Sequence, residues 1–133
     1  EVHHPLAPCP IYTLADGRYV LLYHNNNGKR GEYDQRQRKW KTNYLNHLRY
    51  PAYLAIGEFR PNAHQPIWFS PPKQFADTGG MAIGPKGTSE VATYTCLTEW
   101  RGERILWYPD RKYFLLGKRI NDDWFEGMKV PRL

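Results

Sequence analysis

The stretch from Ile11 to Tyr23 reads Ile-Tyr-Thr-Leu-Ala-Asp-Gly-Arg-Tyr-Val-Leu-Leu-Tyr and decides the fold. Two runs of apolar and aromatic residues, each typical of a strand, flank the pair Asp16-Gly17. Asp-Gly readily takes the positive φ angles of a tight turn of the primed type. The stretch therefore predicts a β-hairpin that turns at Asp16-Gly17.

A second stretch, from Thr93 to Tyr108, has the same pattern and predicts a hairpin that turns at Arg101-Gly102. When the two turn glycines are aligned, Gly17–Tyr23 lies over Gly102–Tyr108, 85 residues further along the chain. The repeats of common β-propellers are shorter, at about 40–50 residues, and long loops would account for the difference. The alignment indicates one repeat that occurs twice.

Three more strands are expected around these hairpins. Tyr50–Phe59 is apolar and compatible with a strand, and Ile67–Phe69 is a short strand bounded by prolines. A loop rich in Gly, Pro and Thr follows at Thr78–Ser89, and a last strand is expected at Tyr113–Ile120. This order predicts one four-stranded antiparallel sheet and most of another, which corresponds to about two blades of a β-propeller. A small β-sandwich fits the same strands.

The chain is therefore expected to form a single all-β unit over residues 1–133, with the organisation of a partial propeller. Residues 10–77 would form one blade, residues 90–120 most of the next, and residues 121–133 a C-terminal tail. Two blades cannot close a propeller, and they leave strand edges and apolar faces open. We expect the remaining blades to come from a longer parent chain or from self-association.

Composition agrees with an all-β fold. Aromatic residues make up 15% of the chain, and such side chains fit half-buried sheet surfaces and line sugar-binding clefts. Eleven Gly and eleven Pro divide the sequence into short segments, which argues against long helices. No apolar run approaches the length of a membrane span, and no signal peptide is visible. We expect no membrane partner.

Much of the formal net charge of +6 comes from the stretch Lys29–Lys41. Such a run is usually a solvated loop, or it can form an electropositive wall that faces an acidic ligand. A nucleic-acid surface is the other interpretation, because Tyr33, Trp40 and Tyr44 lie in and beside the run. That interpretation predicts steeply salt-dependent binding. The basic run is sufficient to attract an acidic sugar, so we do not expect a nucleic-acid partner.

The sequence predicts neither a metal site nor a cofactor. Cys9 and Cys96 have no metal-type spacing, and they permit one disulfide that the sequence cannot assign. The pair His3-His4 has no third ligand nearby and is expected to be part of a flexible terminus.

Three stretches together resemble the C-terminal part of sialidases and their relatives with repeats of the bacterial-neuraminidase type. Ala15–Tyr23 is similar to their repeated inner strands. Pro66–Pro72 is similar to the end of an Asp-box repeat, although Asn62–Gln65 replaces the first part of the box. Tyr94–Thr98 is similar to the segment that carries the catalytic tyrosine. The resemblance extends from about Ile11 to Ile120 and implies a β-propeller.

The resemblance implies a glycoside hydrolase that acts on acidic or complex glycans, with Tyr94 as its nucleophile. Sialidases cleave a sugar that carries a carboxylate at the reacting carbon, and a neutral phenol approaches that anion without charge repulsion. A phenol with a pKa of about 10 needs a neighbouring base to react near neutrality. The alternative is that Tyr94 is a core or rim tyrosine of an inner strand. A secreted or periplasmic location would follow from this resemblance.

The resemblance also implies a substrate-binding set. Arg49 matches the last of three arginines that hold the substrate carboxylate. The alternative is that Arg49 caps the end of a strand in water. Asp110 would orient an arginine, and the adjacent Arg111 is either its partner or a solvated charge. His24 could transfer protons, as histidines do in some propeller lyases and glycosidases, with Asn25 hydrogen-bonding sugar hydroxyls. An Asn-rich turn also forms without any function.

Much of the sialidase apparatus has no counterpart in the sequence. The general acid, the glutamate that activates the tyrosine and two arginines would come from earlier blades, and neither Glu58 nor Glu99 lies in a matching motif. The chain alone is then expected to be inactive. Two other functions stay open: a non-catalytic carbohydrate-binding propeller module, and a propeller polysaccharide lyase that uses His24.

Overall fold

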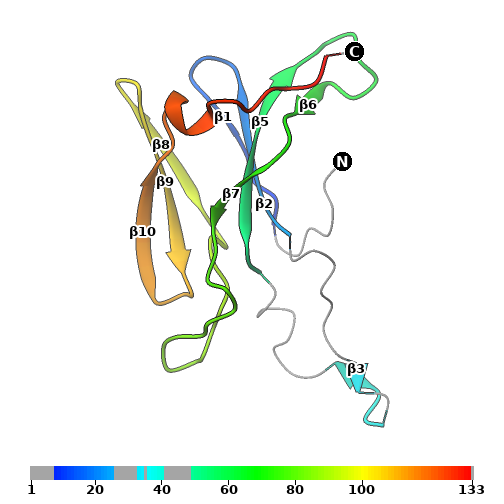
Figure 1. The fold of residues 1–133 in the computed structure, drawn as a ribbon, viewed down its shortest axis with the longest axis vertical. Coiled ribbons are helices and arrows are strands. Elements are labelled where there is room, and N and C mark those ends of the chain that lie inside the picture. The colour runs from blue at the N-terminus through cyan, green and yellow to red at the C-terminus, as the bar shows by residue number, and fades with distance from the viewer. Residues whose placement is uncertain (1–7, 26–32, 35, 41–48, 133) are drawn as a thin grey trace.

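The computed structural model describes residues 8–25, 33–34, 36–40 and 49–132. In these ranges the protein is all-β, with antiparallel sheets and a single short 3-10 helix at Asp122–Phe125 (Figure 1). The expectation of an all-β, antiparallel fold is confirmed.

The first sheet has the order β1-β2-β5-β6, and β7 also pairs with β5. Its strands are β1 (Ile11–Thr13), β2 (Tyr19–His24), β5 (Ala52–Phe59), β6 (Ile67–Phe69) and β7 (Lys73–Ala76). β6 pairs with the C-terminal half of β5 and β7 with its N-terminal half, so the two short strands share one position in the sheet. Pro71 and Pro72 lie between β6 and β7. They interrupt the strand ladder, because proline has no N–H to donate. No strand was predicted at the position of β7.

Ser70 bridges this interruption. Its backbone N–H donates to Ile56 O at 2.8 Å, and its Oγ accepts a hydrogen bond from Ile56 N at 3.1 Å. The side chain thus satisfies the Ile56 N–H at the point where the partner of β5 changes from β6 to β7. The serine of the Trp68–Pro72 stretch therefore has a structural use.

The first hairpin forms where it was predicted, but its turn is of another type. Gly17 has a φ of +87°, and it is the only residue of the β1–β2 loop with a positive φ. Leu14 N donates to Arg18 O at 2.8 Å, which leaves three residues in the loop. Loops of this length combine an ordinary turn with a left-handed glycine, whereas a primed two-residue turn was expected.

The second sheet has the order β10-β9-β8, with β8 (Cys96–Trp100), β9 (Glu103–Asp110) and β10 (Phe114–Arg119). Both of its turns are primed. The predicted turn has φ angles of +49° at Arg101 and +81° at Gly102. The other turn has +53° at Arg111 and +52° at Lys112, which no glycine or asparagine signalled.

A two-stranded hairpin, β3 (Tyr33–Asp34) and β4 (Lys39–Trp40), forms a third small sheet. The exposed turn between these strands contains Arg36 and Arg38, which belong to the predicted basic stretch. Residues 29–32, 35 and 41 of this stretch, Tyr44 and the pair His3-His4 lie outside the described residues.

The hydrophobic core lies between the first two sheets and brings together alternate residues of β2 and β5 with residues from the second half of the chain. Its buried members are Leu14, Val20, Leu22, Ala52, Leu54, Ile56, Phe75, Val91, Ala92, Leu106, Ile120, Phe125 and Val130. Phe75 contacts the ring of Tyr108 edge-on at a centroid distance of 5.0 Å, and so joins the two sheets. Phe125 and Val130 belong to the expected tail, which closes the core.

An ion-pair network lies at one end of the two sheets. Arg104 is only 7% exposed, and its guanidinium reaches Asp122 at 2.8 Å, Glu99 at 3.2 Å and Asp16 at 3.4 Å. Arg18 binds Asp16 at 2.6 Å and Asp122 at 2.7 Å. The arginines hold the pKa of both aspartates below the usual range. The network joins the first hairpin, the second sheet and the 3-10 helix.

Candidate functional site

The opposite end of the two sheets is formed by four segments that meet there (Figure 1). These are the C-terminal end of β2, the residues that precede β5, the loop between β7 and β8, and the C-terminal end of β9. Val91 fixes their arrangement, because its backbone N–H donates to Arg49 O at 3.0 Å and it forms an isolated bridge with Asp110. His24 contacts Val91 O from below the loop.

Glu90 is the centre of a buried polar cluster at this end. Its side chain is 2% exposed, and Arg49 Nη1 lies 3.6 Å from its Oε2. Thr93 Oγ1 donates to the same oxygen at 3.2 Å. Lys112 Nζ lies 3.1 Å from Oε1 but away from the direction of a hydrogen bond, so this contact is one of charge. One carboxylate therefore faces two cations, and the local charge is positive.

The imidazole of His24 is fully buried beside this cluster. Its Nε2 donates to the carbonyl of Val91, because a carbonyl oxygen can only accept. Burial lowers the pKa of His24, and the nearby Arg49 lowers it further. The ring is therefore neutral at neutral pH, with Nδ1 as an acceptor.

His24 makes the stability of the fold depend on pH. An unfolded histidine binds a proton below about pH 6.5, whereas the buried ring resists protonation, so acid favours the unfolded state. We expect the free energy of unfolding to keep its full value above about pH 6.5 and to decrease as the pH falls below it. The measurement is urea unfolding at about pH 7.5 and about pH 5.5.

The matched variants for this measurement are His24→Gln and His64→Gln. The first should flatten the decrease, because glutamine keeps a donor near Val91 O but does not titrate. The second replaces an exposed imidazole and should keep the wild-type decrease. Equal pH dependence in all three proteins would contradict the assignment to His24.

Unused hydrogen-bonding capacity marks the same cluster. Four buried side-chain atoms of the described residues have no hydrogen-bond partner, and three of them are His24 Nδ1, Arg49 Nε and Glu90 Oε1. The fourth, Trp68 Nε1, lies in β6. Unsatisfied buried groups are rare in folded proteins, because each one carries a desolvation penalty. Three of the four therefore lie together in the cluster of His24, Arg49 and Glu90.

Backbone strain collects around the cluster as well. Ala92 and Tyr94 have φ angles of +55° and +63°, and Arg111 and Lys112 have +53° and +52°. Residues with a Cβ adopt this left-handed region at an energetic cost, and such residues are found disproportionately at functional sites. Arg111 and Lys112 contact Glu90, and Ala92 and Tyr94 follow it by two and four residues.

Tyr94 lies in the loop before β8, outside the strand on which the sequence had placed it. Its side chain is 72% exposed, and it follows Thr93, whose hydroxyl binds Glu90. The next residue, Thr95, hydrogen-bonds through Oγ1 to Tyr12 Oη at 2.6 Å. The phenol is therefore held on an anchored loop and is open to solvent.

Asp110 and Arg111 form a bidentate ion pair. Arg111 Nε donates to Asp110 Oδ1 at 2.9 Å, and Nη2 donates to Oδ2 at 3.0 Å. Of the two predicted alternatives, the structure has Arg111 as the partner of Asp110. The guanidinium is thus already occupied. Asn25 lies at the end of β2, where its backbone N–H donates to Pro51 O at 3.2 Å.

Sequence reasoning missed three members of the site: Glu90, Thr93 and Lys112. Glu90 follows a Gly/Pro/Thr-rich loop that has no recognisable motif, and Lys112 occupies a turn position that usually holds glycine. Only the packing of the β7–β8 loop against β9 brings them to Arg49. No signal within the sequence could have found them.

Several other properties bear on the site. No three His, Cys, Asp or Glu residues lie together as a metal site would require in the part of the chain that the structure describes. Cys9 and Cys96 are exposed thiols and are not joined by a disulfide. None of the described helices is long and apolar enough to cross a membrane.

Comparisons of the chain with protein-family models, curated proteins and solved structures find no match.

Proposed function

We propose that this chain supplies part of the active site of a glycoside hydrolase that acts on glycans with a carboxylate. The observation that supports this most is the cluster in which two cations, Arg49 and Lys112, face the one buried carboxylate of Glu90, in the loop that also carries the exposed Tyr94. An anion would bind Arg49, whose side chain is 22% exposed, and the exposed phenol of Tyr94 would approach it from solvent.

Arg49 is the carboxylate-binding residue in this proposal. A guanidinium binds both oxygens of a carboxylate through its planar fork, and the Arg49 side chain is 22% exposed. Glu90 is a positioning residue, because it fixes Nη1 from the buried side at 3.6 Å. The second cation at Glu90, Lys112, keeps the charge positive, which attracts an acidic sugar.

Tyr94 is the nucleophile in this proposal. A glycan bound at Arg49 can be reached only by exposed groups, and the Tyr94 phenol is exposed. The general acid and the base that activates the phenol are assigned to other parts of a complete propeller. His24 is fully enclosed, so the lyase alternative, in which it touches the glycan, has less support.

The proposed architecture is two neighbouring propeller blades. Each of the two larger sheets is a meander of strands in chain order, whereas most β-sandwiches exchange strands between sheets through Greek-key connections. The second sheet has three strands and exposes apolar residues, with Trp100 and Leu115 each 72% exposed. Such exposure is expected of a blade that lacks its neighbour.

The first test is binding of N-acetylneuraminate to the 133-residue chain, followed by NMR on labelled protein. We expect saturable shifts at the amides of Arg49 and of residues 90–94. Arg49→Lys keeps the charge but loses the fork, and it should weaken binding about tenfold, equal to about 1.4 kcal/mol.

The matched control for Arg49→Lys is Arg60→Lys. Arg60 follows the other end of β5 and forms an ion pair with Glu58 at 3.4 Å. This change should leave binding unaffected. Absence of saturable shifts around Arg49, or an equal loss in both variants, would overturn the proposal.

The second test separates a hydrolase from a carbohydrate-binding module. A fluorogenic sialoside is given to the longest available form of the protein, with Tyr94→Phe as the variant. A hydrolase requires turnover that this variant abolishes while sugar binding persists. Sugar binding without turnover in that form would instead support the non-catalytic module.

A further inference from the structure

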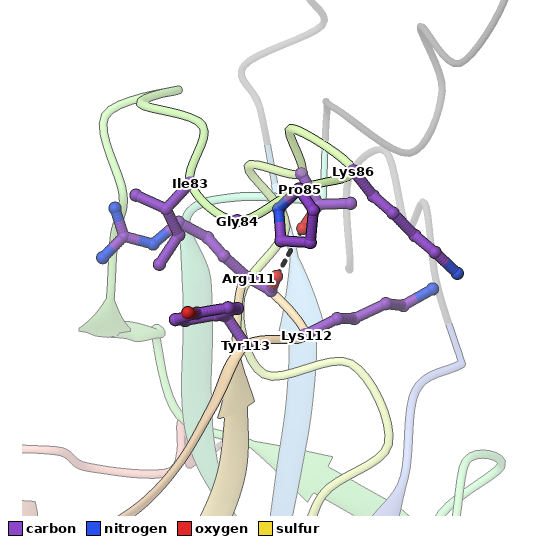
Figure 2. Close-up of a pocket in the computed structure, with 8 residues that line it drawn as sticks. Ile83, Gly84, Pro85, Lys86, Arg111, Lys112 and Tyr113 are labelled. Atoms are coloured by element: carbon purple, nitrogen blue, oxygen red, sulfur yellow. Dashed lines mark hydrogen bonds between the residues drawn. The ribbon is translucent and has the colours of Figure 1, made fainter.

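A second pocket lies beside the buried cluster, between two tight turns of the chain (Figure 2). Its volume is about 200 Å³. Its walls are formed by Ile83, Gly84, Pro85, Lys86, Thr88, Arg111, Lys112 and Tyr113. One turn comes from the β7–β8 loop, and the other is the β9–β10 turn. No residue in this pocket was predicted as part of a site, apart from Arg111.

Both turns are fixed by backbone hydrogen bonds. Ile83 and Thr88 exchange their N–H and C=O groups at 3.1 and 3.2 Å, and Gly87 N donates to Gly84 O at 3.1 Å. In the other turn, Tyr113 N donates to Asp110 O at 3.0 Å. The pocket is therefore formed before any ligand arrives, which reduces the entropy lost on binding.

The two turns are also tied to each other. Thr88 Oγ1 donates to the carbonyl of Arg111, which is the dashed line in Figure 2. Arg111 N donates to Glu90 O at 2.8 Å. These contacts hold Arg111 and Lys112 in the left-handed conformation, where Asn-Gly is the ordinary choice. Strain that the surrounding contacts enforce is a reason to look for a function of this turn.

An aromatic ring forms one side of the pocket. Tyr113 is 58% exposed, and Phe114 packs edge-on against it at a centroid distance of 4.8 Å. The backbone of Gly84 lies so close that a Cβ there would meet Tyr113 Cδ2 at 3.0 Å. With Ile83 and Pro85, this ring makes much of the lining apolar. Pyranose rings stack through their C–H faces on surfaces of this kind.

Two ammonium groups border the same pocket. The side chains of Lys86 and Lys112 run in the same direction in Figure 2, whereas the guanidinium of Arg111 points away from them. Asp110 already neutralises that guanidinium. Lys86 is exposed, and Lys112 is about half exposed, with Glu90 as its ion-pair partner at 3.1 Å. An ammonium has three N–H donors, so this ion pair leaves Lys112 able to bind a ligand.

We propose that this pocket binds a carboxylated pyranose, with the sugar ring on Tyr113 and the carboxylate between Lys86 and Lys112. It is a subsite distinct from Arg49, for a second acidic residue of the glycan. The proposal rests on the proposed function only in assigning the occupant to a glycan substrate. A small inorganic anion uses the lysines but leaves the aromatic and apolar lining without a partner.

The test is NMR titration of the labelled 133-residue chain with methyl β-D-glucuronide, with methyl β-D-glucoside and inorganic phosphate as comparisons. The glucuronide should give saturable shifts at amides 84, 86–88 and 111–113. Lys86→Gln should weaken its binding at least about fivefold, and Lys112→Gln should do the same. The neutral glucoside should bind more weakly than the glucuronide by a similar factor.

The control variant is Arg101→Gln. Arg101 is also a cation at a left-handed position of a primed turn, at the other end of β9. It should not affect glucuronide binding. Lys86→Gln guards against a folding effect, since Lys86 lies exposed on a loop.

Three results would overturn the proposal: no saturable shifts around the pocket, equal affinity for the glucoside, or phosphate binding as tight as the glucuronide. The last would indicate a general anion site. Arg49→Lys should leave the glucuronide shifts in place. If N-acetylneuraminate binds at Arg49 but the glucuronide does not bind at this pocket, only the subsite is rejected. If the glucuronide binds at this pocket but N-acetylneuraminate does not bind at Arg49, only the proposed function is rejected.

Discussion

Replacing Phe75 by Ala is expected to lower the free energy of unfolding by about 3–5 kcal/mol. Phe75 is 2% exposed and is the largest fully buried side chain of the protein's described core. Its ring contacts Tyr108 of the second sheet and also Trp124, at a centroid distance of 6.2 Å. Removing it opens a cavity between the sheets that neither can close without moving the other.

Urea unfolding at neutral pH measures this effect, and Phe59→Ala is its control. Phe59 also lies in the first sheet, but its side chain is 55% exposed, so its removal leaves no enclosed cavity. We expect its effect to be below about 1 kcal/mol. Similar losses for both variants would mean that Phe75 does not connect the two sheets as described.

Replacing Glu90 by Gln is expected to destabilise the protein by about 3 kcal/mol. The change leaves Arg49 without its buried counter-charge and leaves Lys112 without a partner. Full burial of both partners would cost up to about 5 kcal/mol. Arg49 is 22% exposed and Lys112 47%, so solvent offsets part of this penalty.

A double-mutant cycle isolates the pair. Arg49→Met alone and Glu90→Gln alone should each destabilise, and the double variant should lose less than the sum of the two. Strict additivity would show that the two side chains do not interact. Glu103→Gln is the surface control, because its partner Arg119 is 69% exposed, and its effect should stay within about 0.5 kcal/mol.

The parts of the fold that depend on local sequence could be predicted. Asp16-Gly17 and Arg101-Gly102 mark chain reversals through the backbone freedom of glycine, and apolar runs on either side supply the paired strands. The predicted type of the first turn was wrong. The pairing of Leu14 with Arg18 sets the loop length, and strand pairing is not a local property of the sequence. β7 was missed for the same reason: it exists through its register with β5.

The candidate site was predictable only in part. Arg49 and Tyr94 came from a resemblance, and the structure brings both to the same end of the sheets. Glu90 could not be predicted, because an isolated acid in a loop has no distinguishing pattern until the fold buries it. The start of β8 at Cys96, which leaves Tyr94 outside the strand, is set by pairing with Trp107 across the sheet.

The ion-pair network at Arg104 has a consequence for how the molecule comes apart. Asp16 lies near the beginning of the described chain and Asp122 near its end, and Arg104 and Arg18 each bind both of them. Terminal segments of most domains fray independently at little free energy. Here neither the first hairpin nor the 3-10 helix can detach without releasing charges on the other. Opening at either end therefore breaks ion pairs of Arg18 and Arg104, which also bind the other end. We infer that the two ends unfold together.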